Sequence, residues 1–315
     1  MTGVLPAPGP APASQAPAEH RPARSPTVGH VGRPVSGTPG AAIAVRFVGG
    51  GAGTSALLWA VEEADRTGRA LRLVSAAAEP VSPLGHTIWR SEVEGLARHL
   101  ALTGLEYSLG SGPATEVLLA AVSDASLLVV GRQGHRSTDR REVGATAQVL
   151  GQHSPVPLIV VPQQWSQSST FNAPVLVGSS ALEDVDDDGH VRVSGAMWFA
   201  LERATRYRVP LVIVSGGWEQ PTSSAPTGSA PAGDGSGENH FVRRLDAFRG
   251  AHPEVEIASR WLPGSIEEAL VETSGLAQLV VVSRPSTGPD AAPDGLVRHL
   301  LRWSSAPVAI IPPLP

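Results

Sequence analysis

The sequence has no cysteine, two methionines, two tyrosines and no apolar run that approaches the length of a membrane span. Without cysteine the chain has no disulfides, thiolate metal sites or cysteine nucleophiles, which fits a reducing cytosol. A membrane-spanning helix needs about 18 or more consecutive apolar residues, so we expect no membrane partner. The N-terminus lacks the basic and apolar regions of a secretory signal. We therefore expect a cytoplasmic protein.

An excess of basic charge is also missing. Lysine and arginine together number 24, against 29 acidic residues, which gives a net charge of −5. This balance gives no reason to expect a nucleic acid or another polyanion as a partner. The ten histidines lack metal-ligand spacing such as H-E-x-x-H, and there is no paired-carboxylate set, serine triad or G-x-S-x-G elbow. We therefore expect neither a metal site nor catalytic residues.

Proline and glycine are abundant, at 29 and 34 residues, and they are unevenly distributed. Residues 1–40 are rich in proline and alanine without apolar periodicity, which predicts a disordered tail. The proline-, serine- and glycine-rich stretch 219–239 predicts a disordered insertion. Residues 164–172 have the composition of a linker, in which Trp165 is a candidate to hold the flanking domains together.

The rest of the chain divides into two similar halves, residues 41–163 and 173–315. The spacing between matched segments changes only where the proline-rich insertion lies, so the insertion belongs to the second half. Agreement of several segments in order and spacing indicates a tandem duplication. The matched segments are 57–64 with 197–204, 71–75 with 211–215, 112–130 with 264–282, and 157–162 with 307–312.

Strand-like and helix-like segments alternate within each half. The continuous apolar runs Leu127–Val130 and Leu158–Val161 are typical of parallel strands that are covered on both faces. This alternation predicts an α/β fold of two doubly wound, Rossmann-like parallel-sheet domains in tandem, with a site at the carboxyl ends of the strands. In the first half we expect strands at 42–48, 70–75, 106–109, 127–130 and 158–161, and helices near 54–67, 87–103, 114–123 and 144–151.

A glycine-rich segment follows the apolar run that ends the fourth predicted strand. The order of strand, glycine loop and helix places backbone N–H groups and a helix N-terminus around a phosphate. Alternatively, the glycines serve only turns that need positive φ, and the polar residues form a solvated loop. The candidate ligand-binding residues are Gly131, Arg132, Gly134, His135, Gly144, Ala145 and Thr146.

With these motifs the chain resembles the universal stress protein family, in a tandem arrangement. Gly131, Gly134 and Gly144 fit the family's nucleotide-binding motif G-2x-G-9x-G-[S/T], and the closing SPVPLIVVP resembles its last strand. The resemblance implies a stress-response protein with ATP or AMP as the ligand. It also implies an internal pseudo-dimer in which strands 158–161 and 308–311 lie at the mutual interface. Further dimerisation and protein partners are left open.

The chain departs from the family's pattern at several positions. Ala145 stands where nucleotide-binding members carry serine or threonine, and Val48 stands where they carry aspartate. In the second half the first two glycines are lost, and Pro285 removes an N–H donor. We therefore expect at most a weak ATP or AMP site in the first domain and none in the second. The alternative is an interaction scaffold in which both sites are degenerate.

An acidic segment, Asp184 to Gly189, matches the first six positions of a calcium-binding loop, D-x-D-x-D-G. A calcium loop of this type requires a bidentate glutamate at its twelfth position, which here is Gly195. The segment also extends the loop after the first strand of the second half and does not join two helices. An acidic, solvated insertion is therefore favoured over a cation site.

Overall fold

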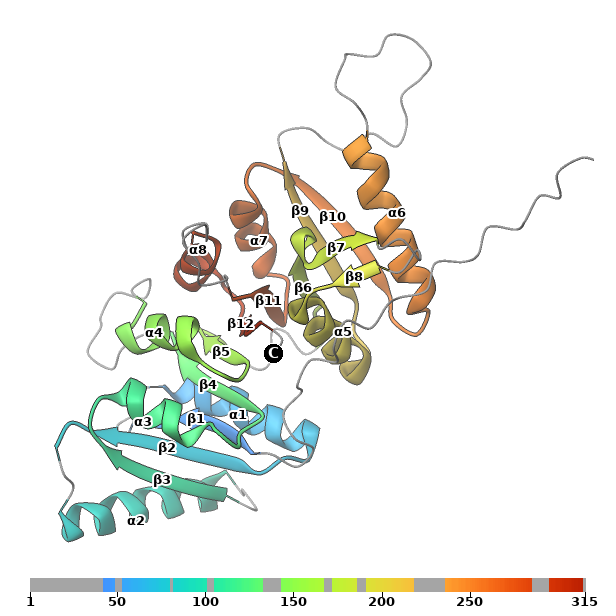
Figure 1. Cartoon of the computed structure of the whole chain (residues 1–315). Helices are drawn as coiled ribbons and strands as arrows, with labels where there is room; N and C mark the ends of the chain where they lie inside the picture. The colour runs from blue at the N-terminus through green and yellow to red at the C-terminus, as the bar shows by residue number, and fades with distance from the viewer. Residues whose placement is uncertain are drawn as a thin grey trace, which may run out of the picture.

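The computed structural model describes residues 42–48, 53–79, 82–100, 105–132, 143–166, 172–185, 191–217, 236–284 and 295–313. The predicted tail at 1–40 lies outside the described residues, as do 167–171 of the predicted linker and 219–235 of the predicted insertion. Figure 1 shows the two halves of the chain end to end, with β5 and β12 between them.

In the first half, strands and helices alternate in the order expected from the sequence. The strand bounds agree closely with those predicted, most clearly for β4 and β5, which are apolar runs that the sheet buries. The elements are β1 (Ile43–Arg46), α1 (Thr54–Thr67), β2 (Leu71–Ala77), α2 (Pro83–His99), β3 (Leu105–Ser111), α3 (Ala114–Ala121), β4 (Leu127–Gly131), α4 (Ala145–His153) and β5 (Leu158–Val161).

The second half repeats this order and adds a short hairpin after its first strand. Its elements are β6 (Val175–Gly178), a 3-10 turn (Ser179–Ala181), β7 (Leu182–Val185), β8 (Val191–Val193), α5 (Gly195–Tyr207), β9 (Leu211–Gly217), α6 (Ser236–Ala251), β10 (Ile257–Pro263), α7 (Ile266–Ser274), β11 (Leu279–Ser283), α8 (Gly295–Trp303) and β12 (Val308–Ile311).

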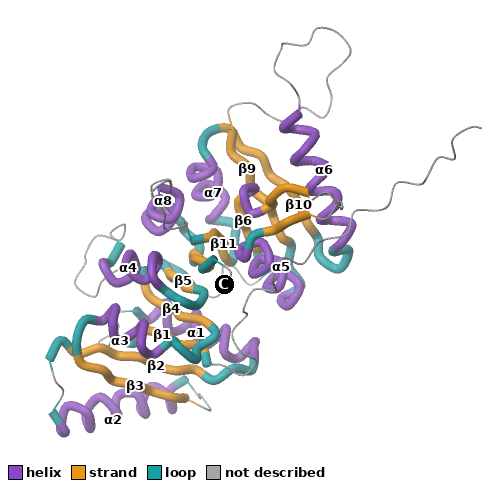
Figure 2. The backbone as a smooth tube through the Cα atoms, in the orientation of Figure 1, coloured by secondary structure: helices purple, strands orange, loops and turns teal. Residues whose placement is uncertain are grey.

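The described strands, apart from β7 and β8, form one ten-stranded sheet in the order β10-β9-β6-β11-β12-β5-β4-β1-β2-β3. Neighbours within each half are parallel, whereas β5 and β12 pair antiparallel, with Ile159 opposite Ala309. This pairing confirms the expected position of 158–161 and 308–311 at the mutual interface. Each half thereby covers a sheet edge that would otherwise be open to unwanted pairing. The sheet runs through both halves in Figure 2.

Helices cover both faces of the sheet, which is why its central strands are apolar throughout. One hydrophobic cluster lies under α1, α2, α5 and α6 and includes Trp59, Met197 and Phe248, all nearly inaccessible to solvent. The other lies under α3, α4, α7 and α8. Each cluster contains residues of both halves, so the interface between the halves is continuous with the cores.

Two glycines confirm the predicted match of 112–130 with 264–282. Gly112, after β3, has φ 121°, and Gly264, after β10, has φ 102°. Both precede a short helix that returns to the sheet, and side chains rarely tolerate this backbone conformation. The N–H of Gly112 donates to Ala77 O at 2.8 Å, and that of Gly264 donates to Gly217 O at 3.2 Å. The duplicated turns are therefore built in the same way.

Helix α2 begins four residues earlier than the helix predicted at 87–103. Ser82 caps it by accepting a hydrogen bond from the Gly85 N–H at 3.1 Å, and Pro83 occupies the first helical turn. Both are strong helix-start features. They place the start of the helix at Pro83 although residues 83–86 have only weak apolar periodicity. Residues 101–103 of the predicted helix lie outside the described residues.

The region after β6 is more ordered than the predicted solvated insertion. Strands β7 and β8 pair antiparallel, with Leu182 opposite Val193. These two side chains are buried in the core, which gives the hairpin its anchor. Asp184 lies on β7, whereas Asp186 to Gly189 lie outside the described residues. In addition, α6 begins at Ser236, so residues 236–239 of the predicted insertion are helical.

Candidate functional site

The two ends of the glycine-rich segment meet at the carboxyl edge of the sheet. Strand β4 ends at Gly131, and α4 begins directly after Gly144. The N–H of Gly144 donates to the carbonyl oxygen of Arg132 at 2.8 Å, which closes the base of the loop. Gly134 and His135 lie outside the described residues. The start of α4 is thus held against the end of β4, where doubly wound sheets bind their ligands.

The N-terminus of α4 is available to an anion. No side chain of the described residues caps it, and its first turn contains no acidic residue. The first N–H groups of a helix have no partners within the helix, and they carry its partial positive charge. Ala145 is exposed and Thr146 is half-buried at this end. These N–H groups can donate hydrogen bonds to a phosphate or carboxylate.

The neighbouring end of β1 provides no carboxylate in its described part. Val48 is half-buried there. The preceding carbonyl, Phe47 O, accepts a hydrogen bond from Ser75 Oγ at 2.8 Å. A ligand at this edge therefore meets an apolar side chain where the family's motif would place an acid. The hydrogen bond that a ligand hydroxyl would donate to an aspartate is missing.

Arg46 is a residue of this edge that the sequence analysis did not single out. It ends β1, and because strand side chains alternate it shares a sheet face with Ala44, beneath α3 and α4. Burial lowers the pKa of Arg46. Within the described residues it forms no ion pair. The detectable sequence feature was a single charge that interrupts the apolar run IAVRFV.

Arg132, a candidate phosphate ligand, is directed into the second half of the molecule. Only 4% of its surface is exposed, and burial lowers its pKa. Its Nη1 donates to Ser304 O at 2.8 Å, and its Nη2 donates to Gln164 Oε1 at 3.3 Å. Arg284 makes the corresponding bond from the second half, with Nη1 2.8 Å from Ser154 O. Pro285 and the residues of the second glycine loop lie outside the described residues.

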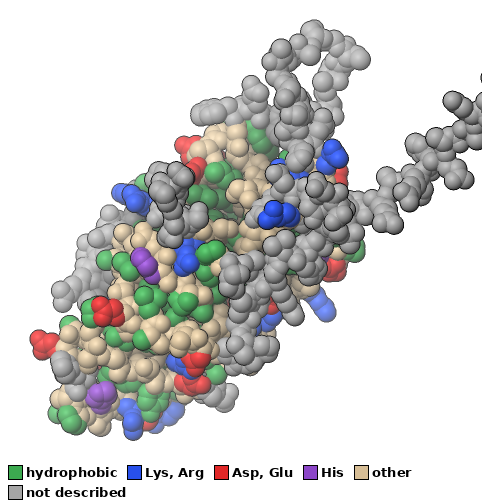
Figure 3. Space-filling view, viewed as in Figure 1, with side chains coloured by type: hydrophobic (Ala, Val, Ile, Leu, Met, Phe, Trp, Pro, Cys, Tyr) green, Lys and Arg blue, Asp and Glu red, His purple; other side chains and the backbone are tan. Residues whose placement is uncertain are grey.

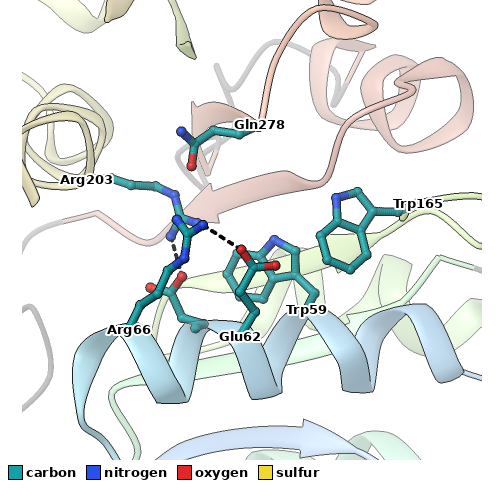
Figure 4. Close-up of a pocket in the computed structure, with 7 residues that line it drawn as sticks. Trp59, Glu62, Arg66, Trp165, Arg203 and Gln278 are labelled. Carbon is teal, nitrogen blue, oxygen red and sulfur yellow. Dashed lines mark hydrogen bonds and ion pairs between the residues drawn. The ribbon is translucent and has the colours of Figure 1, made fainter. Parts of the chain in front are cut away.

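A second polar cluster joins α1 to α5. Glu63 Oε2 accepts a hydrogen bond from Arg203 Nη1 at 2.8 Å, and both residues are 8% exposed. The Arg203 guanidinium lies over the rings of Trp59, at 5.1 Å, and Tyr207, at 4.5 Å. Figure 4 shows Arg203 reaching toward α1, with Trp59 and Trp165 beside each other. Trp165 is buried in this interface, as the linker prediction proposed.

Other site chemistries find no support in the described parts of the chain. No group of three or more histidine or acidic side chains is positioned there to hold a metal ion. None of the described helices combines the length and the apolar character that crossing a membrane requires.

Comparison with known proteins shows which family the first half of the chain is similar to. Residues 43–162 match the model of the universal stress protein family. Over 256 residues the chain is 29% identical to the universal stress protein Rv2623 of Mycobacterium tuberculosis. This alignment covers 74% of this chain and 82% of Rv2623. The chain is 25% identical over 259 residues to the universal stress protein Rv2624c of the same organism, with 78% and 86% covered.

Solved structures agree on the fold. A universal stress protein from Archaeoglobus fulgidus superimposes with a TM-score of 0.63 at 13% identity, over 87% of this chain and 99% of that one. A protein of unknown function from Pseudomonas aeruginosa gives a TM-score of 0.59 at 14% identity, over 86% and 92%. Both alignments extend over the two halves.

Proposed function

We propose that this chain, whose residues 43–162 match the universal stress protein family model, acts in a stress response by binding a ligand. The ligand is ATP or AMP, held weakly at the carboxyl edge of the first half. The protein binds this ligand without turning it over, and it does so in the cytoplasm. The second half acts as the structural partner of the first.

One observation carries this proposal: the uncapped N-terminus of α4 is fixed against the end of β4. The hydrogen bond from Gly144 N to Arg132 O sets that geometry before any ligand arrives. A helix N-terminus with free N–H groups favours the negative charge of a phosphate. Arg46 adds a cation at the same sheet edge, on the face that α4 covers. A phosphate in this position would meet both.

Three features limit the affinity of this site. Val48 removes a carboxylate, Ala145 removes a hydroxyl, and the Arg132 guanidinium is already bonded to Ser304 O. A hydrogen bond to a charged group contributes about 1.5–3 kcal/mol, so each missing bond of this kind weakens binding by an order of magnitude or more. This is why we propose a weak site.

The competing function is an interaction scaffold that binds no nucleotide. The position of Arg132 favours it, since a motif residue has been recruited to hold the two halves together. In that case the fold serves as a framework, and its surface binds protein partners.

Melting temperature in the presence of ATP and magnesium separates the two functions. A ligand at 100 times its Kd adds about 2.7 kcal/mol of stability. We expect a rise at millimolar ATP that Gly134→Val abolishes and Arg46→Gln reduces. Ser286→Val is the matched control, because Ser286 occupies the position of Gly134 in the second half. No rise for the parent protein would support the scaffold. Phosphate release above the no-protein rate would contradict binding without turnover.

A further inference from the structure

A cavity of about 290 Å³ lies between α2 and β3, at the outer edge of the first half. Strand β3 is separated from β4 and its glycine loop by β1 and β2. The cavity is close to the lower end of the size range of small-molecule pockets, about 300 Å³. Its lining residues are His86, Thr87, Trp89, Arg90, Tyr107 and Leu109.

Two aromatic rings form one wall of this cavity. The centroids of Trp89 and Tyr107 are 5.6 Å apart, with ring planes at 72°. The Trp89 indole N–H donates to Ser75 Oγ at 3.1 Å, and Ser75 Oγ donates to Phe47 O at 2.8 Å. The polar atom of the indole is therefore satisfied by the sheet, and the ring is held in place. Tyr107 is 40% exposed, so its ring is accessible to a ligand.

The charged groups of the lining are basic. The Arg90 guanidinium lies 5.8 Å from the centroid of the Tyr107 ring. Within the described residues Arg90 forms no ion pair. His86 lies one helical turn before it, on the same side of α2. Since none of the described residues that line the cavity is a carboxylate, the charge of Arg90 is available to an anion.

The described part of the second half differs from this cavity wall at the position of Tyr107. Ser259 on β10 occupies the position of Tyr107 and carries no ring. The outer helix of that half, α6, buries Phe248 completely, whereas α2 has only Val93 buried. Helix α2 therefore packs fewer buried side chains against its sheet edge than α6 does. Figure 3 shows hydrophobic, basic and histidine side chains next to one another over α2, at the lower end of the molecule.

We propose that this cavity binds a planar aromatic anion, whose ring packs against Trp89 and Tyr107 and whose acidic group pairs with Arg90. Rings supply a flat apolar surface with defined geometry, and an unpaired guanidinium matches a carboxylate, sulfonate or phosphate. This site is distinct from the glycine loop and does not depend on nucleotide binding there.

Isothermal titration of the full chain with 1-naphthoate tests the proposal. We expect saturable binding with one site per chain. Cyclohexanecarboxylate, an anion without a planar ring, and 1-naphthalenemethanol, a planar ring without charge, should each bind about tenfold more weakly or worse. Equal binding of all three compounds, or no saturable binding of naphthoate, would overturn the proposal.

Variants locate the site. Tyr107→Ser, which copies the second half, and Arg90→Gln should each weaken naphthoate binding about tenfold. Tyr107→Phe keeps the ring and should bind like the parent, as should Arg98→Gln, which changes an exposed arginine of α2 outside the lining. Unchanged binding by Arg90→Gln would place the probe elsewhere and contradict the site. Gly134→Val should retain naphthoate binding even if it abolishes the rise in melting temperature with ATP. The two proposals can therefore be contradicted independently of each other.

Discussion

Arg132 and Ser304, which are 172 positions apart in the chain, are joined by a 2.8 Å hydrogen bond from the guanidinium to a carbonyl oxygen. Arg284 and Ser154 form the matching 2.8 Å bond in the opposite direction. Each arginine directly follows the strand that precedes a glycine loop or its remnant, and each serine ends the helix after that loop. The two halves therefore hold each other by reciprocal contacts, as the subunits of a two-fold dimer do.

Removing either arginine should destabilise the whole chain. Arg132→Ala leaves the buried carbonyl of Ser304 without its donor, and an unsatisfied buried polar group costs about 1–3 kcal/mol. We expect a loss of this size in the free energy of unfolding, measured by urea denaturation, and a similar loss for Arg284→Ala. Arg298→Ala, on the surface of α8, is the control and should change little. Losses below about 0.5 kcal/mol for both variants would show that these bonds do not hold the halves.

The buried pair of Glu63 and Arg203 should be more sensitive still. Breaking a buried ion pair from one side leaves an uncompensated charge and costs about 3–5 kcal/mol. We therefore expect Arg203→Met to lower the free energy of unfolding by that amount and Glu63→Gln to lower it less. The exposed pair of Glu202 and Arg206 on α5 provides the control, and Arg206→Met should cost under about 1 kcal/mol. Equal effects of Arg203→Met and Arg206→Met would contradict this account.

A backbone position in the second half offers a gain in stability. Arg208 ends α5 with φ 53° and ψ 47°, and the matched residue that ends α1 is Gly68, with φ 65°. A side chain in this left-handed conformation is strained, whereas glycine adopts it readily. Arg208→Gly should therefore raise the free energy of unfolding by about 0.5–1 kcal/mol. Gly68→Arg should lower it by a comparable amount, and the opposite signs of the two changes check each other in thermal denaturation.

Alkaline pH should destabilise the protein through Tyr207. Burial raises the pKa of Tyr207 above its ordinary value of 10.0. Above pH 10 the unfolded chain loses the tyrosine proton while the folded chain keeps it, so the folded state binds more protons. The free energy of unfolding then falls as pH rises, by at most about 1.4 kcal/mol per pH unit for this group.

The composition makes this dependence easy to isolate. All 24 basic side chains are arginine, and the chain has no cysteine, so tyrosine is the side-chain type of this sequence whose ordinary pKa lies near 10. Tyr207→Phe should flatten the decline in urea-denaturation stability between pH 9.5 and pH 11. A decline that persists in full in Tyr207→Phe would assign it to another cause.

The sequence predicted much of the fold because the fold depends on local patterns, and these patterns occur in both halves of the duplicated chain. Apolar runs such as Leu127–Val130 fix the strands, and the matched spacing around Gly112 and Gly264 fixes the shared turns. The direction of Arg132 could not be predicted, since its partner lies 172 positions away and no periodicity encodes that contact. The cavity beside Tyr107 was missed for the same reason: it depends on how α2 is placed over β3.

The pairing of Glu63 with Arg203 also determines which assemblies the two halves can form. The two residues occupy the same position of the repeat, 140 residues apart, yet they face each other across the pseudo-symmetry axis. In a true homodimer each residue at such an axis meets its own copy. Two copies of the first half would bring two glutamates together in a buried site, and two copies of the second half would bring two arginines together. Covalent duplication thus permitted an asymmetry that makes each half fit the other better than it fits itself.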